Sequence, residues 1–190
     1  DRPDQKPENM PNEYFYKAPE LVGPEGTVEL LDIPPVAVFQ PEAELAFVMG
    51  KRAKNVKEAD AMDYVFGYVP FIDISARGMV RRTQFLPKGQ DTYGPCGPWI
   101  TTKDEIPDPQ HLSIQVEQNG KPVMTAHTSN MICGLREHIR FLSGVLTLSP
   151  GVLSTTGTPA GVSQLADGDH LKGSIERIGE MEIDVRAERG

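Results

Sequence analysis

Hydrophobic residues along the chain form short runs bounded by glycine, proline, asparagine or aspartate, a pattern typical of β-rich domains. These runs predict strands, and Asn119-Gly120 between two of them predicts a hairpin turn. Two other segments, Lys57–Phe66 and Leu135–Leu146, carry apolar residues at helical spacing. The predicted strands are Thr27–Leu31, Glu44–Met49, Tyr68–Ser75, Leu112–Glu117, Pro122–Thr128, Gly151–Thr156, His170–Ile175 and Met181–Val185. We therefore expect one mainly β domain with short helices.

Composition narrows the class of protein. Hydrophobic residues make up 38% and charged residues 24% of the chain, as in ordinary globular domains. A net charge of −8 with scattered basic residues argues against a nucleic-acid partner. No run reaches the roughly 20 apolar residues of a membrane helix, so we expect no membrane partner. Cys96 and Cys133 lack metal-ligand spacing and are interpreted as reduced thiols of a cytoplasmic protein, with a single disulfide as the alternative.

Three acidic residues stand in or beside apolar runs. Glu42 and Glu44 are two residues apart, so a strand would place both side chains on one face. Asp73 interrupts the apolar strand Tyr68–Ser75. The plainer interpretations are solvated glutamates and an ion pair of Asp73 with Arg77 or another base. Together, the three carboxylates favour a divalent cation that neutralises their repulsion. All-oxygen ligation indicates Mg²⁺ first, with Mn²⁺ or Ca²⁺ next.

An ordered set of motifs resembles the fumarylacetoacetate hydrolase family. The motifs are PEAELAFVMG at 41–50, FIDISARG at 71–78, KGQDTYGPCGPW at 88–99 and TGTPAGV at 156–162. The similarity runs from about Tyr14 to the C-terminus. It implies a mixed β-roll with two or three short helices, usually a homodimer. Apolar runs such as Phe47-Val48-Met49 could supply the dimer surface or, equally, core.

The same resemblance implies a site. It places the metal ligands on Glu42, Glu44 and Asp73. It assigns substrate binding to Arg77, Lys88 and Thr158, with Lys88 also catalytic because its charge could stabilise a developing oxyanion. Members of the family act on 2-oxo and β-diketo acids, so we expect a metal-dependent hydrolase or lyase of such an acid. An isomerase or hydratase, or a non-catalytic metal- and carboxylate-binding domain, are the alternatives.

Two departures from the family pattern affect the substrate and the reaction. Gly78 and Val80 stand where many relatives have an acid and a glutamine, so one polar substrate contact is lost. Hydrolytic relatives also have an N-terminal lid with a histidine and a glutamate that activate water. Residues 1–13 contain no histidine and are charged and proline-rich, so we expect a flexible segment that follows a missing lid, with the catalytic domain at 14–190. His127 is a weak candidate for the base.

Overall fold

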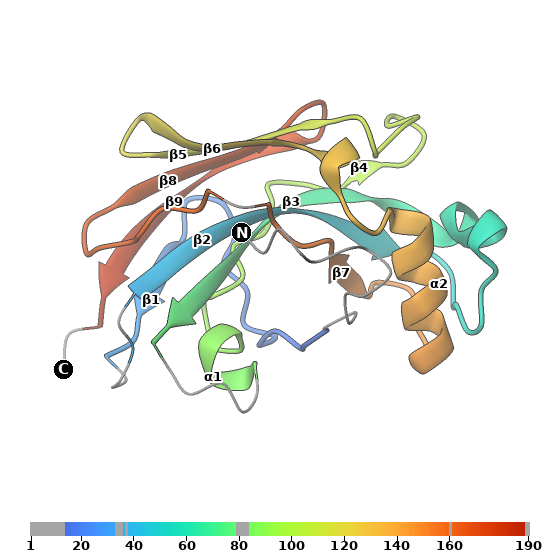
Figure 1. Cartoon of the computed structure of the whole chain (residues 1–190), viewed down its shortest axis with the longest axis horizontal. Helices are drawn as coiled ribbons and strands as arrows, with labels where there is room; N and C mark the ends of the chain where they lie inside the picture. The colour runs from blue at the N-terminus through green and yellow to red at the C-terminus, as the bar shows by residue number, and fades with distance from the viewer. Residues whose placement is uncertain (1–13, 33–35, 37, 79–83, 160, 189–190) are drawn as a thin grey trace.

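The computed structural model describes residues 14–32, 36, 38–78, 84–159 and 161–188, so the predicted flexible segment 1–13 lies outside the described residues. Two sheets face each other in this part of the chain (Figure 1). One sheet has the strand order β1-β9-β8-β5-β6 and the other β4-β3-β2-β7. The strands are β1 Thr27–Leu30, β2 Val38–Met49, β3 Val65–Arg77, β4 Thr101–Thr102, β5 Ser113–Gln118, β6 Lys121–His127, β7 Leu153–Thr155, β8 His170–Ile175 and β9 Gly179–Ala187.

Strand pairing confirms the mainly β, mixed architecture. Strand β1 pairs with β9 in parallel, whereas β2–β3, β5–β6, β5–β8 and β8–β9 are antiparallel. Asn119 and Gly120 have φ angles of 54° and 75° and join β5 to β6, which is the predicted hairpin. Two consecutive positive φ angles match the twist of the flanking strands, as in a type I′ turn.

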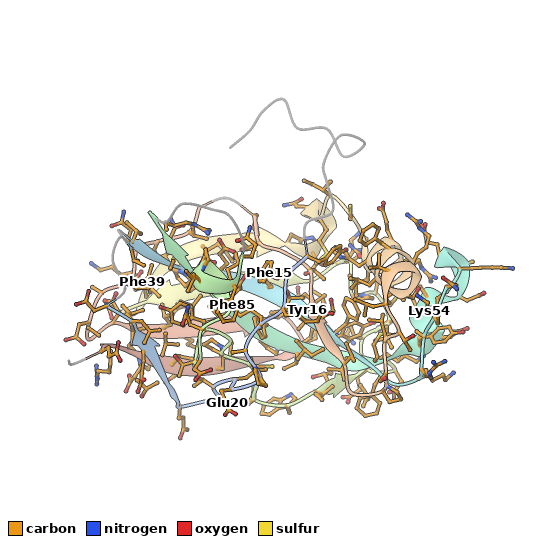
Figure 2. The ribbon with its side chains drawn as sticks, turned by 90° about the horizontal axis from the view of Figure 1, so that it is seen from below. Phe15, Tyr16, Glu20, Phe39, Lys54 and Phe85 are labelled. Atoms are coloured by element: carbon orange, nitrogen blue, oxygen red, sulfur yellow. The ribbon has the colours of Figure 1, made fainter. Side chains whose placement is uncertain are left out.

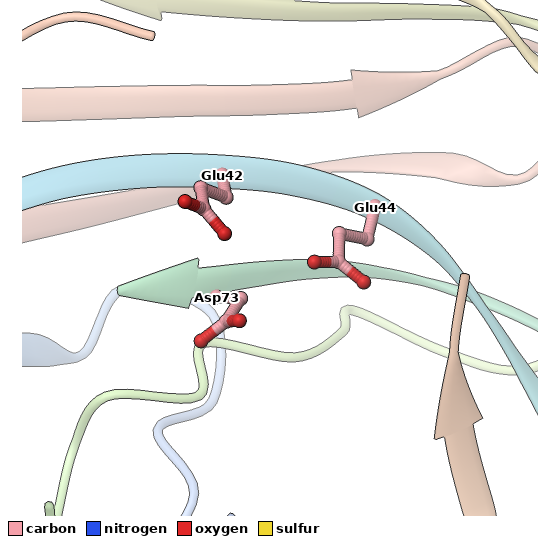
Figure 3. Close-up of side chains that lie close together, drawn as sticks. All are labelled: Glu42, Glu44 and Asp73. Carbon is pink, nitrogen blue, oxygen red and sulfur yellow. The ribbon is translucent and has the colours of Figure 1, made fainter. Parts of the chain in front are cut away.

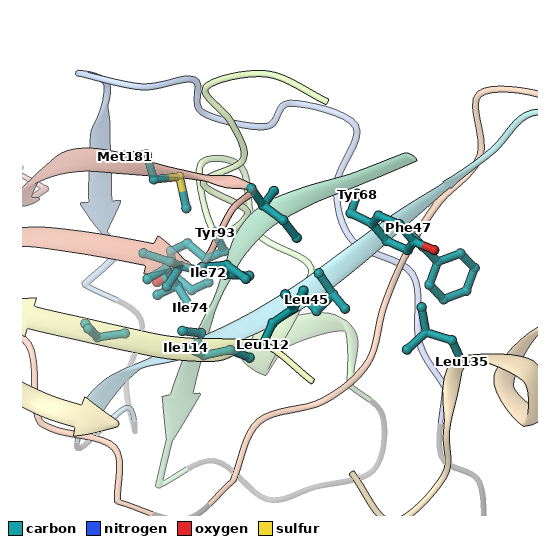
Figure 4. Close-up of a cluster of buried hydrophobic side chains, with 14 of the residues drawn as sticks. Leu45, Phe47, Tyr68, Ile72, Ile74, Tyr93, Leu112, Ile114, Leu135 and Met181 are labelled. Atoms are coloured by element: carbon teal, nitrogen blue, oxygen red, sulfur yellow. The ribbon is translucent and has the colours of Figure 1, made fainter. Parts of the chain in front are cut away.

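The main core lies between the two sheets. Alternate residues of β2 and β3, including Leu45, Phe47, Ile72 and Ile74, point into this core (Figure 4). Gly173 on β8 allows the sheets to approach closely, because a Cβ there would lie 3.1 Å from Cδ1 of Ile72. Phe47 and Met49 belong to this core and Val48 is buried on the opposite face of β2, so this run is core and not a dimer surface.

The helices are short, and one helical prediction is wrong in type. Helix α2, Leu135–Val145, confirms the second predicted helix. The first is the 3₁₀ helix η2, Glu58–Tyr64, and Val65 already belongs to β3, where it pairs with Met49. Cross-strand pairing outweighs the weak helical propensity of Val65 and its aromatic neighbour.

Three short elements were not predicted from the sequence. Helix α1, Phe85–Lys88, has four residues and strand β4 has two, too few for a periodic pattern. A second 3₁₀ turn, η3, covers Thr128–Asn130. Among the described residues, no helix is long and apolar enough to span a membrane.

The outer face of the β2–β3 pair, turned away from the other sheet, is apolar at one end and polar at the other. Ala46, Val48, Val69 and Phe71 form a small second core on this face. The acidic residues follow at the polar end, and α1 packs against β3 there. The fold thus places a charged site on a buried sheet surface.

Candidate metal centre and active site

Strand register brings the three predicted metal ligands together. Glu42 lies opposite Asp73 in the antiparallel β2–β3 pair, and Glu44 lies two residues further along the same face of β2. Their side chains converge in Figure 3, with one carboxylate oxygen from each within 4.8 Å of the others. All three are buried, with exposures of 8%, 3% and 1% for Glu42, Glu44 and Asp73. Three carboxylates so close together repel one another unless a positive charge lies near them.

Basic side chains contact two of the three carboxylates. Nζ of Lys88 donates to Oε2 of Glu42 and to Oδ2 of Asp73, both at 2.6 Å, and to Oγ of Ser75 at 2.5 Å. Nζ of Lys17 donates to Oδ1 of Asp73 at 2.6 Å. Arg77 pairs with the remaining oxygen of Glu42. Asp73 therefore accepts from Lys17 and Lys88, so its ion-pair partners are bases other than Arg77, which pairs with Glu42.

Glu44 is held by backbone as well as by side chains. Strand β7 pairs with β2 through Ala46 and Thr155, so the chain that continues from β7 passes beside Glu44. The N–H of Gly157 donates to Oε2 of Glu44 at 2.7 Å, from a backbone with φ of 84° that suits glycine. Burial, and next the charge of Asp73, raise the pKa of Glu44 to about 7.

The cluster fits a hard divalent cation. An added positive charge would keep Glu44 ionised at neutral pH despite its burial. Oxygen ligands on opposite sides of Mg²⁺ are about 4.2 Å apart, so the 4.8 Å spread needs only small side-chain rotations. Burial lowers the pKa of the Lys17 ammonium, although Asp73 opposes that shift. The lysines and the cation would compete for the same carboxylate oxygens.

A cavity of about 750 Å³ lies next to the cluster. It is lined by Glu44, Lys17 and Thr158 at the metal centre and extends to His127 and His138. Its wall includes both apolar and hydroxyl-bearing side chains, among them Phe71, Met131, Ile132, Leu153, Ser154 and Thr155. This volume is larger than a three-carbon acid needs. The cavity therefore also fits an acid that carries a longer or bulkier substituent.

Of the three predicted substrate-binding residues, one lines the cavity and two contact the metal ligands. Thr158 lines the cavity, with Oγ1 3.5 Å from Sδ of Met124. Lys88 and Arg77 contact the carboxylates and do not line the cavity. The Lys88 ammonium lies 5.1 Å from the centre of the Phe15 ring, which covers it. Gly78 is exposed with φ of 95°, and Val80 lies outside the described residues.

Sequence reasoning missed Lys17 and Phe15. Both belong to an irregular segment with no strand or helix periodicity, and a single lysine there is usually a solvated side chain. The aromatic residues around Lys17, in Tyr14-Phe15-Tyr16, are the one signal that this segment packs against the protein. His127 lines the cavity, and its Nδ1 lies 2.7 Å from Oγ of Ser129.

Two packed β-sheets with a buried carboxylate cluster beside a large cavity define a protein with a hard-cation site on a β-roll. The family model for the C-terminal domain of fumarylacetoacetate hydrolase matches residues 1–186. The chain belongs to the fumarylacetoacetate hydrolase family, as its motifs predict, and its structural neighbours share the fold.

Individual relatives give the range of chemistry in the family. The maleylpyruvate hydrolase of Aquipseudomonas alcaligenes is 41% identical over 146 residues, which are 77% of this chain and 50% of that protein. The crystal structure of maleylpyruvate hydrolase from Sphingobium sp. SYK-6 with manganese(II) ion and pyruvate superposes with a TM-score of 0.83 and 36% identity, covering 90% of this chain and 62% of that one. A 5-carboxymethyl-2-hydroxymuconate delta-isomerase from Mycobacterium smegmatis has a TM-score of 0.83 and 33% identity, covering 89% and 66%. The chain thus spans two thirds or less of each of these relatives.

Proposed function

We propose that this protein is a divalent-metal-dependent enzyme that hydrolyses a C–C bond of a 2-oxo or β-diketo acid, or decarboxylates such an acid. The observation that carries the proposal is the buried cluster of Glu42, Glu44 and Asp73 beside the 750 Å³ cavity. Manganese and pyruvate in the similar Sphingobium hydrolase support this cation and substrate class. Mg²⁺ or Mn²⁺ suits the all-oxygen ligands, and Ca²⁺ is the third candidate.

The charges around the cluster favour a ligand with two negative charges. The site holds equal numbers of carboxylate and cationic side chains, Glu42, Glu44 and Asp73 facing Lys17, Arg77 and Lys88. A divalent cation would leave a surplus of two positive charges. A 2-oxo acid in its enolate form carries a carboxylate and an oxyanion, which match this surplus. When bound, the cation supplies Lewis acidity that stabilises negative charge on the keto oxygen.

The chain's own residues contribute position, charge and exclusion of water. Lys88 offers a positive charge, and a proton, to an oxyanion formed beside Asp73, because its ammonium is buried there. Phe15 covers that ammonium and shields it from solvent. Thr158 presents a hydroxyl to the ligand in the cavity, and Arg77 holds Glu42 in place.

An isomerase or hydratase is the second candidate. The isomerase from Mycobacterium smegmatis superposes on this chain as well as the Sphingobium hydrolase does. Both reaction classes pass through an enolate of the substrate, so the carboxylate cluster serves either. They differ in whether a water molecule attacks a carbonyl carbon.

Proton exchange at C3 of a 2-oxo acid tests the enzymatic proposal apart from hydrolysis. With Mn²⁺ or Mg²⁺ we expect this chain to exchange the C3 protons of pyruvate for deuterium faster than buffer with metal, because enolisation needs only the charged site and a base. NMR in D₂O measures the rate, and the same protein with a chelator is the control. Metal-dependent turnover in a panel of 2-oxo and diketo acids then assigns the reaction.

Exchange at the buffer rate, together with no turnover of any acid in the panel, would contradict an enzymatic function. If the chain still bound Mn²⁺ under these conditions, a non-catalytic metal- and carboxylate-binding domain would replace the proposal. Hydrolysis without added residues upstream of Asp1 would contradict the expectation that a lid is required. His127 would then be the first base to replace, since it lines the cavity.

We also propose that the protein acts as a homodimer in the cytoplasm. Family resemblance supports the dimer, and large apolar side chains such as Phe66 and Trp99, with exposures of 49% and 61%, offer contact surface. The interpretation of Cys96 and Cys133 as reduced thiols, made from the sequence, supports the cytoplasm. We expect sedimentation equilibrium to give twice the monomer mass at micromolar concentration. A monomer under these conditions would reject the dimer.

A further inference from the structure

The residues Tyr14–Lys17, here called the strap, connect helix α2 to the metal centre. At its start, the hydroxyl of Tyr14 lies 2.7 Å from Nδ1 of His138 on α2. The Tyr14 ring also stacks on Phe141, one helical turn away, with centroids 5.2 Å apart and an interplanar angle of 16°. Phe15 and Tyr16 follow and share a small pocket with Phe85 of α1, on the side seen in Figure 2.

The Tyr14–His138 contact is a hydrogen bond between two uncharged groups. Burial lowers the pKa of His138, so its imidazole is neutral at pH 7. Burial raises the pKa of Tyr14 to about 12, so its hydroxyl keeps its proton. A neutral hydroxyl and a neutral imidazole share one hydrogen bond, in which the tautomer of His138 sets which group donates.

The other end of the strap brings a charge to the metal ligands. Lys17 follows Tyr14 by three residues, and its Nζ lies 2.6 Å from Oδ1 of Asp73. Its side chain is only 14% exposed, so water screens this charge weakly. A divalent cation that binds Asp73 would have to approach this ammonium closely. The repulsion lowers the affinity of the site for the cation.

We infer that Tyr14 is a positioning residue: anchored on α2 by His138 and Phe141, it holds Lys17 against Asp73, where Lys17 weakens and so sets the affinity for the divalent cation. The inference rests on the metal-dependent function proposed above. It assigns no chemical step to Tyr14. It predicts that replacing Tyr14, which acts on Asp73 only through Lys17, changes the affinity for the cation.

A double-mutant cycle read by Mn²⁺ calorimetry on the full chain tests this coupling. We expect Lys17→Met to tighten Mn²⁺ binding about tenfold, since it removes one like charge beside Asp73. Tyr14→Ala should tighten it severalfold, because the strap then releases Lys17. The double variant should bind no more tightly than Lys17→Met alone, since both changes act through one ammonium. Tyr16→Phe, which removes a hydroxyl from a residue 82% exposed on the same strap, is the matched control.

Three results would overturn the inference. They are an unchanged Mn²⁺ affinity in Lys17→Met, an unchanged affinity in Tyr14→Ala, and fully additive effects in the double variant. Thermal unfolding in chelator shows whether each variant is folded. If Tyr14→Ala unfolds, Tyr14→Phe takes its place in the cycle, because it keeps the stack on Phe141 and loses only the hydrogen bond. Calorimetry needs no turnover, so a positive cycle in a catalytically inactive chain would reject the proposed enzymatic function and leave this inference standing.

Discussion

Replacing Asp73 with alanine is expected to abolish Mg²⁺ and Mn²⁺ binding. Asp73 is 1% exposed and lies opposite Glu42 in the strand register, at the point where the three carboxylates meet. Without it, Glu42 and Glu44 alone offer too few charged ligands to strip water from a hard cation. Calorimetry on the full chain measures the loss. An affinity for Mn²⁺ equal to that of the wild type would exclude Asp73 as a ligand.

The same change should destabilise the metal-free protein. Asp73 accepts from Lys17 and Lys88, so its removal leaves both ammonium groups short of a partner in a buried site. Breaking a buried ion pair costs about 3–5 kcal/mol, which denaturant unfolding in chelator would detect. Asp73→Asn keeps the volume and replaces Asp73→Ala if the alanine variant does not fold. Asp63→Ala, at an exposed position of η2, removes one charge without touching the site and is the control.

Replacing Lys88 with methionine is expected to lower kcat by about 10²–10³-fold, which is the usual effect of losing one preorganised charge at a water-poor site. The Lys88 ammonium is buried between Glu42, Asp73 and the ring of Phe15, so solvent cannot replace it easily. Methionine keeps the unbranched shape and most of the apolar contacts of the side chain, and is one heavy atom shorter. The kcat for the best acid from the panel, at saturating metal, is the measurement.

The affinity for Mn²⁺ distinguishes a catalytic role of Lys88 from a role in holding the metal-binding carboxylates in place. With a positive charge removed beside the cluster, Mn²⁺ affinity should hold or rise in Lys88→Met. Lys51→Met, which changes an exposed lysine after β2, should leave both kcat and affinity as in the wild type. A kcat within a few-fold of wild type would show that Lys88 does not stabilise the transition state. A large loss of Mn²⁺ affinity would instead make Lys88 part of the support for the ligands.

Strand alternation makes part of the site predictable from the order of residues alone. A spacing of two residues places Glu42 and Glu44 on one face of any strand, and burying both requires a positive charge. Asp73 is recognisable as unusual, because it stands in an apolar run. The residue that lies opposite Asp73 cannot be recognised in this way, since alternation does not specify which residue of another strand it pairs with. Lys88 and Thr158 are candidates only through resemblance to the family, because neither stands out by pattern.

The sequence by itself determined the mainly β class, helix α2 and the Asn119-Gly120 hairpin, because each depends on local periodicity or on backbone conformation within a few residues. It also determined the family, through motifs in order along the chain. The tertiary structure alone decided that Val65 joins a strand and not a helix, since its pairing with Met49 is a long-range contact. It alone brought Lys17 to Asp73, 56 residues apart, because an irregular segment is positioned by what it packs against and not by a repeating pattern of its own.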